Sequence, residues 1–313
     1  MMNKEPKLTK EMFEPIQQQF HEAEKISRPS LSYWKDAWLR LKENKLAMLG
    51  LMIIIVLAIL AIIGPYLNGY TFYEQDFTKK NLRPNAEHWF GTDSSGRDLF
   101  TRAWYGARIS LFIGLMAALI DFTVGVIYGG ISGARGGKID NFMMRVAEIL
   151  YAIPYLLVVI LIMVVLEKIQ RGIWPIIIAM TITGWIPMAR LVRGQVLQLK
   201  EYEFVQAARA MGASTTWALK KHMIPNTMGP ILVNVTLTVP TAIFTEATLS
   251  FLGLGIPAPQ ASWGTMANDA LGSILIGNFY QLFIPAFLIS LTMFAFNVFG
   301  DGLRDALDPR LRK

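Results

Sequence analysis

The segment LAMLGLMIIIVLAILAIIGPYL at residues 46–67 decides the fold class, because it contains no charged residue over its whole length. A helix of about 20 apolar residues spans the hydrocarbon core of a bilayer. Lipid cannot satisfy backbone polar groups, so such a segment must be helical. The run is too long for the apolar region of a signal peptide, and Gly64-Pro65-Tyr66 is not a small-residue cleavage site. We therefore expect a retained first transmembrane helix.

The remainder of the chain repeats this character. The 313 residues are 53% hydrophobic and 17% charged, whereas soluble domains carry roughly 25% charged residues. Five more segments are long and apolar enough to cross a membrane, at residues 109–130, 142–166, 174–191, 228–252 and 281–299. The sequence predicts an all-α membrane protein with six transmembrane helices.

The basic residues predict the orientation of these helices. Lys and Arg gather before the first segment, after the second and fourth, and at the C-terminus, whereas residues 253–280 contain none. Because short cytoplasmic loops are enriched in Lys and Arg, we expect both termini on the cytoplasmic side. Residues 253–280 and the loop 68–108 are then extracellular. The net charge of +7 follows from topology and does not indicate a nucleic-acid partner.

Two flanking segments have their own character. Residues 1–30 form a polar cytoplasmic extension, and residues 304–313 form a cytoplasmic tail. Residues 31–45 place Leu31, Trp34, Trp38 and Leu41 at helical spacing. That pattern favours an interfacial amphipathic helix in contact with membrane lipid over an ordinary soluble helix.

Polar residues inside the spans are candidates for a transport path. Acids within membranes usually face protein or a water-filled path. For Asp121 we expect a structural role. For Glu246 we expect with equal weight that it lines a path or that it satisfies a neighbouring helix. Residues 228–252 form the most polar span, and the candidate pathway-lining residues are Asn234, Thr238, Thr241 and Glu246.

Glycines and prolines indicate how the helices pack. Gly125, Gly129 and Gly133 form one stripe on the second span, which allows a neighbouring helix to approach closely. That neighbour could belong to this chain or to a second subunit. Prolines at positions 154, 187, 240 and 285 either kink their helices or reflect packing alone, and packing is the preferred reading for each.

No pattern indicates an enzyme. The chain has no cysteine, and its three histidines are scattered, so no metal-ligand or catalytic cluster emerges. Residues 133–138 resemble a phosphate-binding loop, but Ser132 and Ile139 occupy positions where that loop needs Gly and Ser or Thr. We expect no catalytic, cofactor or metal residue in this chain.

The segment between the fourth and fifth spans is unusually long. Residues 203–211 favour a helix that Gly212 ends, and a second, basic helix runs to Ile224-Pro225. A helical loop of this size at a membrane surface suits docking of a cytoplasmic partner, although an interfacial brace is the simpler alternative.

Three groups of residues resemble a known family. Gln206-Ala207-Ala208, Gly212 and Ile224-Pro225 resemble the EAA loop of ATP-binding-cassette (ABC) importer permeases, with Gln206 where the family has Glu. The segments 88–93, 96–98 and 106–110, together with 250–255, 261–264 and 300–309, are similar to C-type subunits of oligopeptide and dipeptide permeases. The resemblance extends over residues 30–313.

The resemblance implies a type I ABC importer permease fold, with five helices in residues 109–303 and a coupling loop at 200–226. It implies a multi-pass protein of the bacterial cell membrane that forms half of a path for oligopeptides. The ATPase-coupling residues would be Glu203, Gln206, Ala207, Ala208, Gly212, Ile224 and Pro225. Its partners would be a homologous B-type permease, two cytoplasmic ATPase subunits that bind ATP and Mg, and an extracellular peptide-binding lipoprotein.

Alternatives stay open for the transported solute and for the class of transporter. Similar C-type subunits serve dipeptides, nickel or other small solutes. From a different class, a secondary transporter would couple through Asp121 and Glu246.

Overall fold

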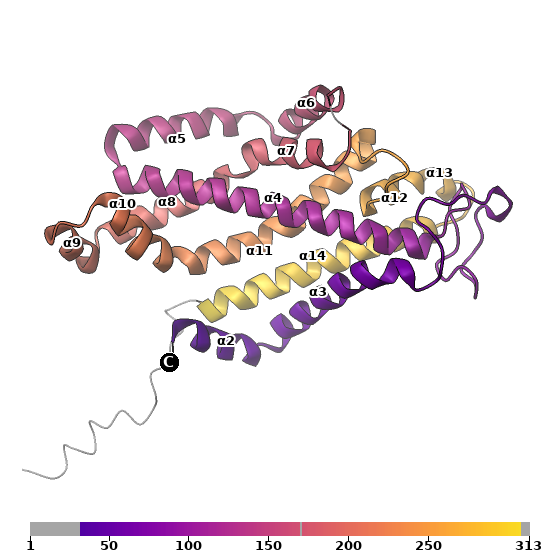
Figure 1. Cartoon of the computed structure of the whole chain (residues 1–313), viewed down its shortest axis with the longest axis horizontal. Coiled ribbons are helices and arrows are strands. Elements are labelled where there is room, and N and C mark those ends of the chain that lie inside the picture. Colours follow the sequence, from indigo (N-terminus) through magenta and orange to yellow (C-terminus); the bar gives the residue numbers. More distant parts are fainter. Residues whose placement is uncertain (1–31, 170, 308–313) are drawn as a thin grey trace, which may run out of the picture.

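In a computed structural model, which describes residues 32–169 and 171–307, helices run along a common long direction (Figure 1). The described chain contains no strand beyond one isolated bridge between Thr92 and Asp98. The helices are α2 (Tyr33–Glu43), α3 (Lys45–Ile63), α4 (Leu99–Arg135), α5 (Gly137–Ala152), α6 (Tyr155–Glu167), α7 (Ile173–Gly184), α8 (Ile186–Lys200), α9 (Glu203–Ala210), α10 (Thr215–Ala218), α11 (Ile224–Leu249), α12 (Trp263–Asp269), α13 (Leu271–Ile274) and α14 (Tyr280–Leu307).

The prediction of an all-α membrane protein is confirmed. Five continuous segments of the described chain are long and apolar enough to span a bilayer: Lys45–Tyr66, Leu99–Arg135, Ile173–Lys200, Thr215–Leu254 and Tyr280–Leu307. A sixth span arises if α5 and α6, which are bent by 82° relative to each other, are counted together. Several helices extend beyond the ends of the predicted spans, because polar residues beside an apolar run can continue the same helix.

The start of α4 shows one such difference. The helix begins at Leu99, inside the segment 68–108 predicted as a loop. Asp98 is its N-cap, and its carboxylate accepts a hydrogen bond from the Thr101 backbone N–H at 2.8 Å. An N-cap aspartate satisfies one of the unpaired N–H groups in the first turn of a helix. At the other end of the chain, α14 carries residues 304–307 of the predicted tail, and the segments 1–31 and 308–313 lie outside the described residues.

Pro154 breaks the third span, contrary to the expectation that it reflects packing alone. The preceding residue, Ile153, has an extended backbone (φ −80°, ψ 132°), so α5 ends at Ala152. A proline ring disfavours a helical conformation in the residue before it. Pro187 instead lies in the first turn of α8, where its missing N–H costs nothing. Pro240 and Pro285 lie inside the continuous helices α11 and α14.

The glycine stripe on α4 packs against α8 of the same chain, which settles the question of its neighbour. A Cβ placed on Gly129 would lie 2.1 Å from the Ala189 carbonyl oxygen. A Cβ on Gly125 would lie 2.5 Å from Cγ of Met188. Only glycine permits this approach of two helix backbones.

The helices α2, α3 and α14 pack together along one side of the molecule (Figure 1). A Cβ on Gly302 of α14 would lie 2.2 Å from Cβ of Ala47 on α3. Asn44 separates α2 from α3 and caps α3 by accepting the Ala47 N–H at 3.1 Å. Trp34 and Trp38 of α2 are 53% and 44% exposed, and Leu31, the first residue of the predicted interfacial pattern, lies outside the described residues.

Candidate functional site

Two ends of the molecule and one cavity between them carry the candidate function. The α9 end comprises α9, α10 and the adjoining ends of α4, α5 and α8. The α12 end comprises α12, α13 and residues 68–98, and Figure 1 shows the two ends at opposite extremes of the long axis.

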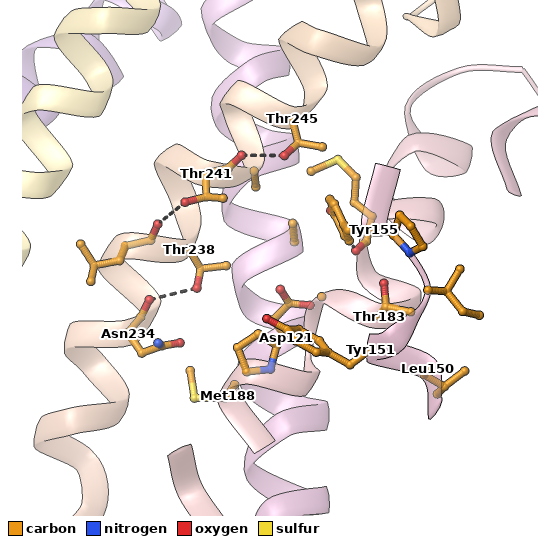
Figure 2. Close-up of a pocket in the computed structure, with 18 of the residues that line it drawn as sticks. Asp121, Leu150, Tyr151, Tyr155, Thr183, Met188, Asn234, Thr238, Thr241 and Thr245 are labelled. Carbon is orange, nitrogen blue, oxygen red and sulfur yellow. Dashed lines mark hydrogen bonds between the residues drawn. The ribbon is translucent and has the colours of Figure 1, made fainter. Parts of the chain in front are cut away.

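The cavity has a volume of about 610 Å³ and lies between α4, α7, α8, α11 and the α5–α6 break. Figure 2 shows side chains of α11 on one side of it and Tyr155 and Thr183 on the other. Three of the four predicted pathway residues, Asn234, Thr238 and Thr241, belong to its wall. Clefts of roughly 300–1,000 Å³ are typical of small-molecule sites.

The α11 wall of this cavity is polar but carries no charged residue. Its residues recur at three- or four-residue intervals and so share one helix face. The hydroxyl of Thr238 donates to the Asn234 carbonyl at 2.9 Å, and that of Thr241 donates to the Leu237 carbonyl at 2.9 Å. Such bonds to the preceding turn use the hydroxyl hydrogen. The threonine oxygens therefore face the cavity chiefly as acceptors.

Asp121 lines this cavity, between the α11 side chains and Thr183 in the view of Figure 2, although its sequence position favoured a structural role. Its side chain belongs to α4 and packs where a Cβ on Gly184 would be 2.8 Å from Oδ2. Its Oδ1 atom is buried and accepts no hydrogen bond from the described residues, and the same is true of the Thr183 hydroxyl beside it. The absence of a side chain at Gly184, which no spacing rule signals, leaves room for the carboxylate.

Glu246 does not line the cavity, so its predicted pathway role is not supported by the geometry. The side chain is fully buried, and its Oε1 accepts hydrogen bonds from Ser250 at 2.7 Å and Ser262 at 2.6 Å. Its Oε2 accepts one from Ser110 at 3.2 Å. The carboxylate thus satisfies neighbouring elements, which was the other reading of this residue, and it joins α11 to α4 and to the start of α12.

Sequence reasoning missed that three separate motifs meet at Glu246. Ser110 ends the segment 106–110, Ser250 begins 250–255, and Ser262 lies in 261–264. The Trp263 backbone N–H donates to Ser110 Oγ at 3.2 Å, and its indole N–H donates to the Ala103 carbonyl at 3.0 Å. The signal was a buried acid together with several motif serines, but only the fold brings them into contact.

Charged pairs hold the α12 end together. Arg97 donates to Asp93 at 2.6 Å and to Asp269 of α12 at 2.8 Å. Arg102 of α4, only 1% exposed, also donates to Asp269 at 3.1 Å. His88 lies 2.9 Å from the N-cap Asp98. The motif residues of 88–98 therefore fasten the loop to α4 and α12.

Two segments of this loop approach each other closely at Gly96 and Asp76. Gly96 has φ +75°, and a Cβ there would lie 1.8 Å from the Asp76 carbonyl oxygen. Hydrogen bonds from the Thr78 side chain and backbone lower the pKa of the Asp76 carboxyl. The close approach thus requires glycine at position 96, and the lowered pKa favours the ionised form of the Asp76 carboxyl.

At the α9 end, α9 has one buried and one exposed face. Val205 and Ala208 are buried against the rest of the chain, whereas Glu203, Gln206 and Ala207 are exposed. Residues three and four apart share a helix face, so the exposed trio forms a single outward surface. We call Glu203, Gln206 and Ala207 the α9 outer face.

Gly212 ends α9 in a left-handed conformation with φ +92°. The next residue, Ala213, donates its N–H to the Ala208 carbonyl at 3.0 Å. This is the hydrogen bond of a Schellman cap, in which glycine is favoured. A Cβ on Gly212 would meet nothing within 4 Å, so a larger residue there acts through backbone strain and not through a clash.

Ile224 and Pro225 differ from their predicted place at the end of a helix. The helix that starts at Thr215 passes through a π-helical turn, Leu219–Met223, and continues into α11. Pro225 is exposed in the first turn of α11. A widened turn accommodates the proline without ending the helix. The second arm of the predicted coupling loop therefore continues without a break into the helix that forms one wall of the cavity.

Comparison with known proteins identifies the family. Residues 125–313 match the family model described as "Binding-protein-dependent transport system inner membrane component". Residues 32–84 match the "N-terminal TM domain of oligopeptide transport permease C". The chain belongs to the binding-protein-dependent transport permeases. The expected ABC importer permease is thereby confirmed, and the family is a non-catalytic membrane subunit.

Relatives of this permease match almost its whole length. It is 60% identical over 303 residues to the dipeptide transport system permease protein DppC of Bacillus subtilis (strain 168), covering 97% of this chain and 94% of that one. It is 58% identical to the oligopeptide transport system permease protein OppC of the same organism, covering 98% and 99%. It is 40% identical to OppC of Escherichia coli (strain K12), covering 93% and 95%.

A solved structure supports the permease fold. A chain from inward-facing conformations of the MetNI methionine ABC transporter matches with a TM-score of 0.53, covering 65% of this permease and 94% of that chain. The two are 20% identical, so the match concerns the fold alone. An ABC importer permease works with a second permease and with ATPase subunits, so both are partners of this membrane protein.

Proposed function

We propose that this permease imports oligopeptides, forming half of their path and coupling to a cytoplasmic ATPase through the α9 outer face. The observation that carries the proposal is the α9 outer face itself. α9 is a short helix with one exposed face, it is capped by Gly212, and it packs against α10, which continues without a break into α11. Such an arrangement suits docking into another protein.

The charge distribution supports an orientation with the α9 end in the cytoplasm. Arg135 and Lys200 end α4 and α8, and Lys220 and Lys221 precede α11. Basic residues concentrate on the cytoplasmic side of membrane proteins. Residues 253–280 at the α12 end hold no Lys or Arg. The termini would then be cytoplasmic, and the α12 end would meet a peptide-binding lipoprotein outside.

The route from the α9 outer face to the cavity suggests how ATP binding would act. Movement of α9 by the ATPase passes to α10, which contacts it, and then through the π-helical turn to α11. The cavity face of α11 carries Asn234, Thr238 and Thr241. The path would thus open and close as a rigid α11 moves. ATP and Mg would be bound by the partner subunits.

The oligopeptide assignment rests on the relatives. Their names include both dipeptide and oligopeptide permeases at nearly equal identity, so dipeptides are the nearest alternative. The α11 wall, which carries no charged residue, suits a path that passes many sequences without binding any tightly.

A bulky residue on the α9 outer face tests the proposal. Ala207→Trp should abolish uptake of radiolabelled trialanine in a strain that lacks its own peptide importers and expresses the complete transporter. Ala58→Trp is the matched control, because Ala58 is also exposed but lies on the membrane-facing side of α3 among apolar residues. Normal uptake by the Ala207→Trp transporter would contradict coupling through α9. Failure of the unmodified transporter to import trialanine would contradict the peptide assignment.

A further inference from the structure

The buried, unpaired carboxylate of Asp121 distinguishes the cavity from an ordinary apolar cleft. Asp121 is 7% exposed, and its Oδ1 accepts no hydrogen bond from the described residues. No described basic side chain forms an ion pair with it. An isolated buried charge is costly unless a partner satisfies it. A ligand that enters the cavity can be that partner.

The groups around Asp121 are mostly acceptors. The hydroxyls of Thr238, Thr241 and Thr245 all donate to backbone carbonyls of the preceding turn, each at 2.9 Å. The Tyr155 hydroxyl donates to the Met180 carbonyl at 3.3 Å. The lone pairs of these oxygens stay free, whereas the Asn234 amide and the hydroxyls of Thr183 and Tyr151 can also offer a donor.

A cavity rich in acceptors with a single negative charge fits an ammonium group. An ammonium offers three donors and no acceptor, and its positive charge complements the carboxylate. Asp121 is the only charged residue among the described residues that line the cavity. Removal from water strengthens such a pairing. A peptide carboxylate would instead be repelled from this part of the path.

We propose that Asp121 binds the α-ammonium group of a peptide, with the threonine oxygens of α11 as additional acceptors. The cavity then holds the N-terminal part of the peptide during passage, and a free N-terminus becomes a requirement of the path itself. This inference rests on the proposed peptide function. It assigns the permease a substrate contact that is shared by all peptides with free N-termini and is independent of their sequence.

The requirement for a free N-terminus gives a direct test. The purified complete transporter, in lipid nanodiscs, is compared as wild type, Asp121→Asn and Asp301→Asn. Asp301 is an exposed acid on α14 outside the cavity, and it serves as the matched control. Binding of labelled trialanine and N-acetyl-trialanine is measured by equilibrium dialysis. Uptake of trialanine is measured in the deletion strain.

Asp121→Asn should weaken trialanine binding by about tenfold or more, because a hydrogen-bonded charge pair is lost. The weaker binding of N-acetyl-trialanine should stay unchanged, and Asp301→Asn should match the wild type. Equal losses for both peptides would overturn the inference and point to a structural role or to a cationic residue of the partner permease. Unchanged binding and uptake of trialanine by Asp121→Asn would also overturn it.

Two further results keep the test decisive. If Asp121→Asn prevents assembly, Asp121→Glu keeps the charge and should still prefer trialanine to its N-acetyl form, whereas loss of that preference would overturn the inference. If the unmodified transporter imports no peptide, the proposed function fails, and this inference fails with it. Normal import by both wild type and Asp121→Asn overturns the Asp121 site alone.

Discussion

Replacing Glu246 with alanine should strongly destabilise the contact between α11, α4 and α12. The carboxylate accepts three serine hydroxyls at 2.6–3.2 Å in a fully buried site. Hydrogen bonds to a charged group contribute about 1.5–3 kcal/mol each. Because Ser110 and Ser262 keep other contacts, we expect a loss of about 3–5 kcal/mol, less than three independent bonds would give.

Glu246→Gln separates hydrogen bonding from charge. The amide oxygen can still accept from Ser250 and Ser262, which both bond Oε1. The amide N–H₂ then faces Ser110 Oγ, which can accept from it by turning its own hydrogen away. We expect a loss of only about 1 kcal/mol. The two variants therefore differ in how many serine hydroxyls lose their partner.

Reversible unfolding of the purified transporter in mixed micelles measures both losses, and hydrogen exchange of residues 263–269 localises them. Exchange in α12 should rise strongly for Glu246→Ala and weakly for Glu246→Gln. Equal destabilisation by the two variants would refute the hydrogen-bond reasoning, because it would make the negative charge decisive. A loss below about 1 kcal/mol for alanine would refute the structural role itself.

Two glycine pairs offer matched tests of packing. Gly129→Ala should lower unfolding free energy by about 1–3 kcal/mol, because its Cβ meets the α8 backbone at 2.1 Å, whereas Gly194→Ala on α8 meets nothing within 4 Å and should be neutral or stabilising. Thermal unfolding of the two variants checks this, and similar melting temperatures would contradict the close α4–α8 contact. Gly96→Ala should open the loop 68–98, because its Cβ would lie 1.8 Å from the Asp76 carbonyl oxygen. Gly69 has nearly the same positive φ but nothing within 4 Å of a Cβ. Gly69→Ala should therefore cost only about 1 kcal/mol of backbone strain. Limited proteolysis of the loop separates the two, and equal protection would contradict the clash.

The membrane fold could be predicted from sequence because each span carries its own signal. Residues 46–67 need no partner to be recognised as a membrane helix. Local geometry was harder to foresee. Pro154 and Pro187 look alike in sequence, yet one breaks a span and the other begins a helix. The difference depends on whether the residue before the proline is extended, as Ile153 is, or helical, as Ile186 is.

Part of the candidate site could also be predicted, because it depends on a local pattern in the sequence. Asn234, Thr238 and Thr241 share a helix face, and that periodicity is visible in the sequence. Asp121 and Glu246 are both lone acids within spans, so sequence alone could not rank them. Three serine hydroxyls from separate parts of the sequence donate hydrogen bonds to the Glu246 carboxylate. Gly184 has no side chain, which leaves room for the Asp121 carboxylate beside the cavity. Those contacts depend on the tertiary fold.

Crosslinking from the α9 outer face tests the central proposal most directly. The chain has no cysteine, so Gln206→Cys gives this chain a single thiol for a maleimide photocrosslinker, which is attached before assembly with the other subunits. Ala58→Cys on α3 is the control. Coupling through α9 predicts a covalent product between this permease and the ATPase subunit from position 206 and none from position 58. A labelled Gln206→Cys transporter that yields no ATPase product on illumination would contradict it.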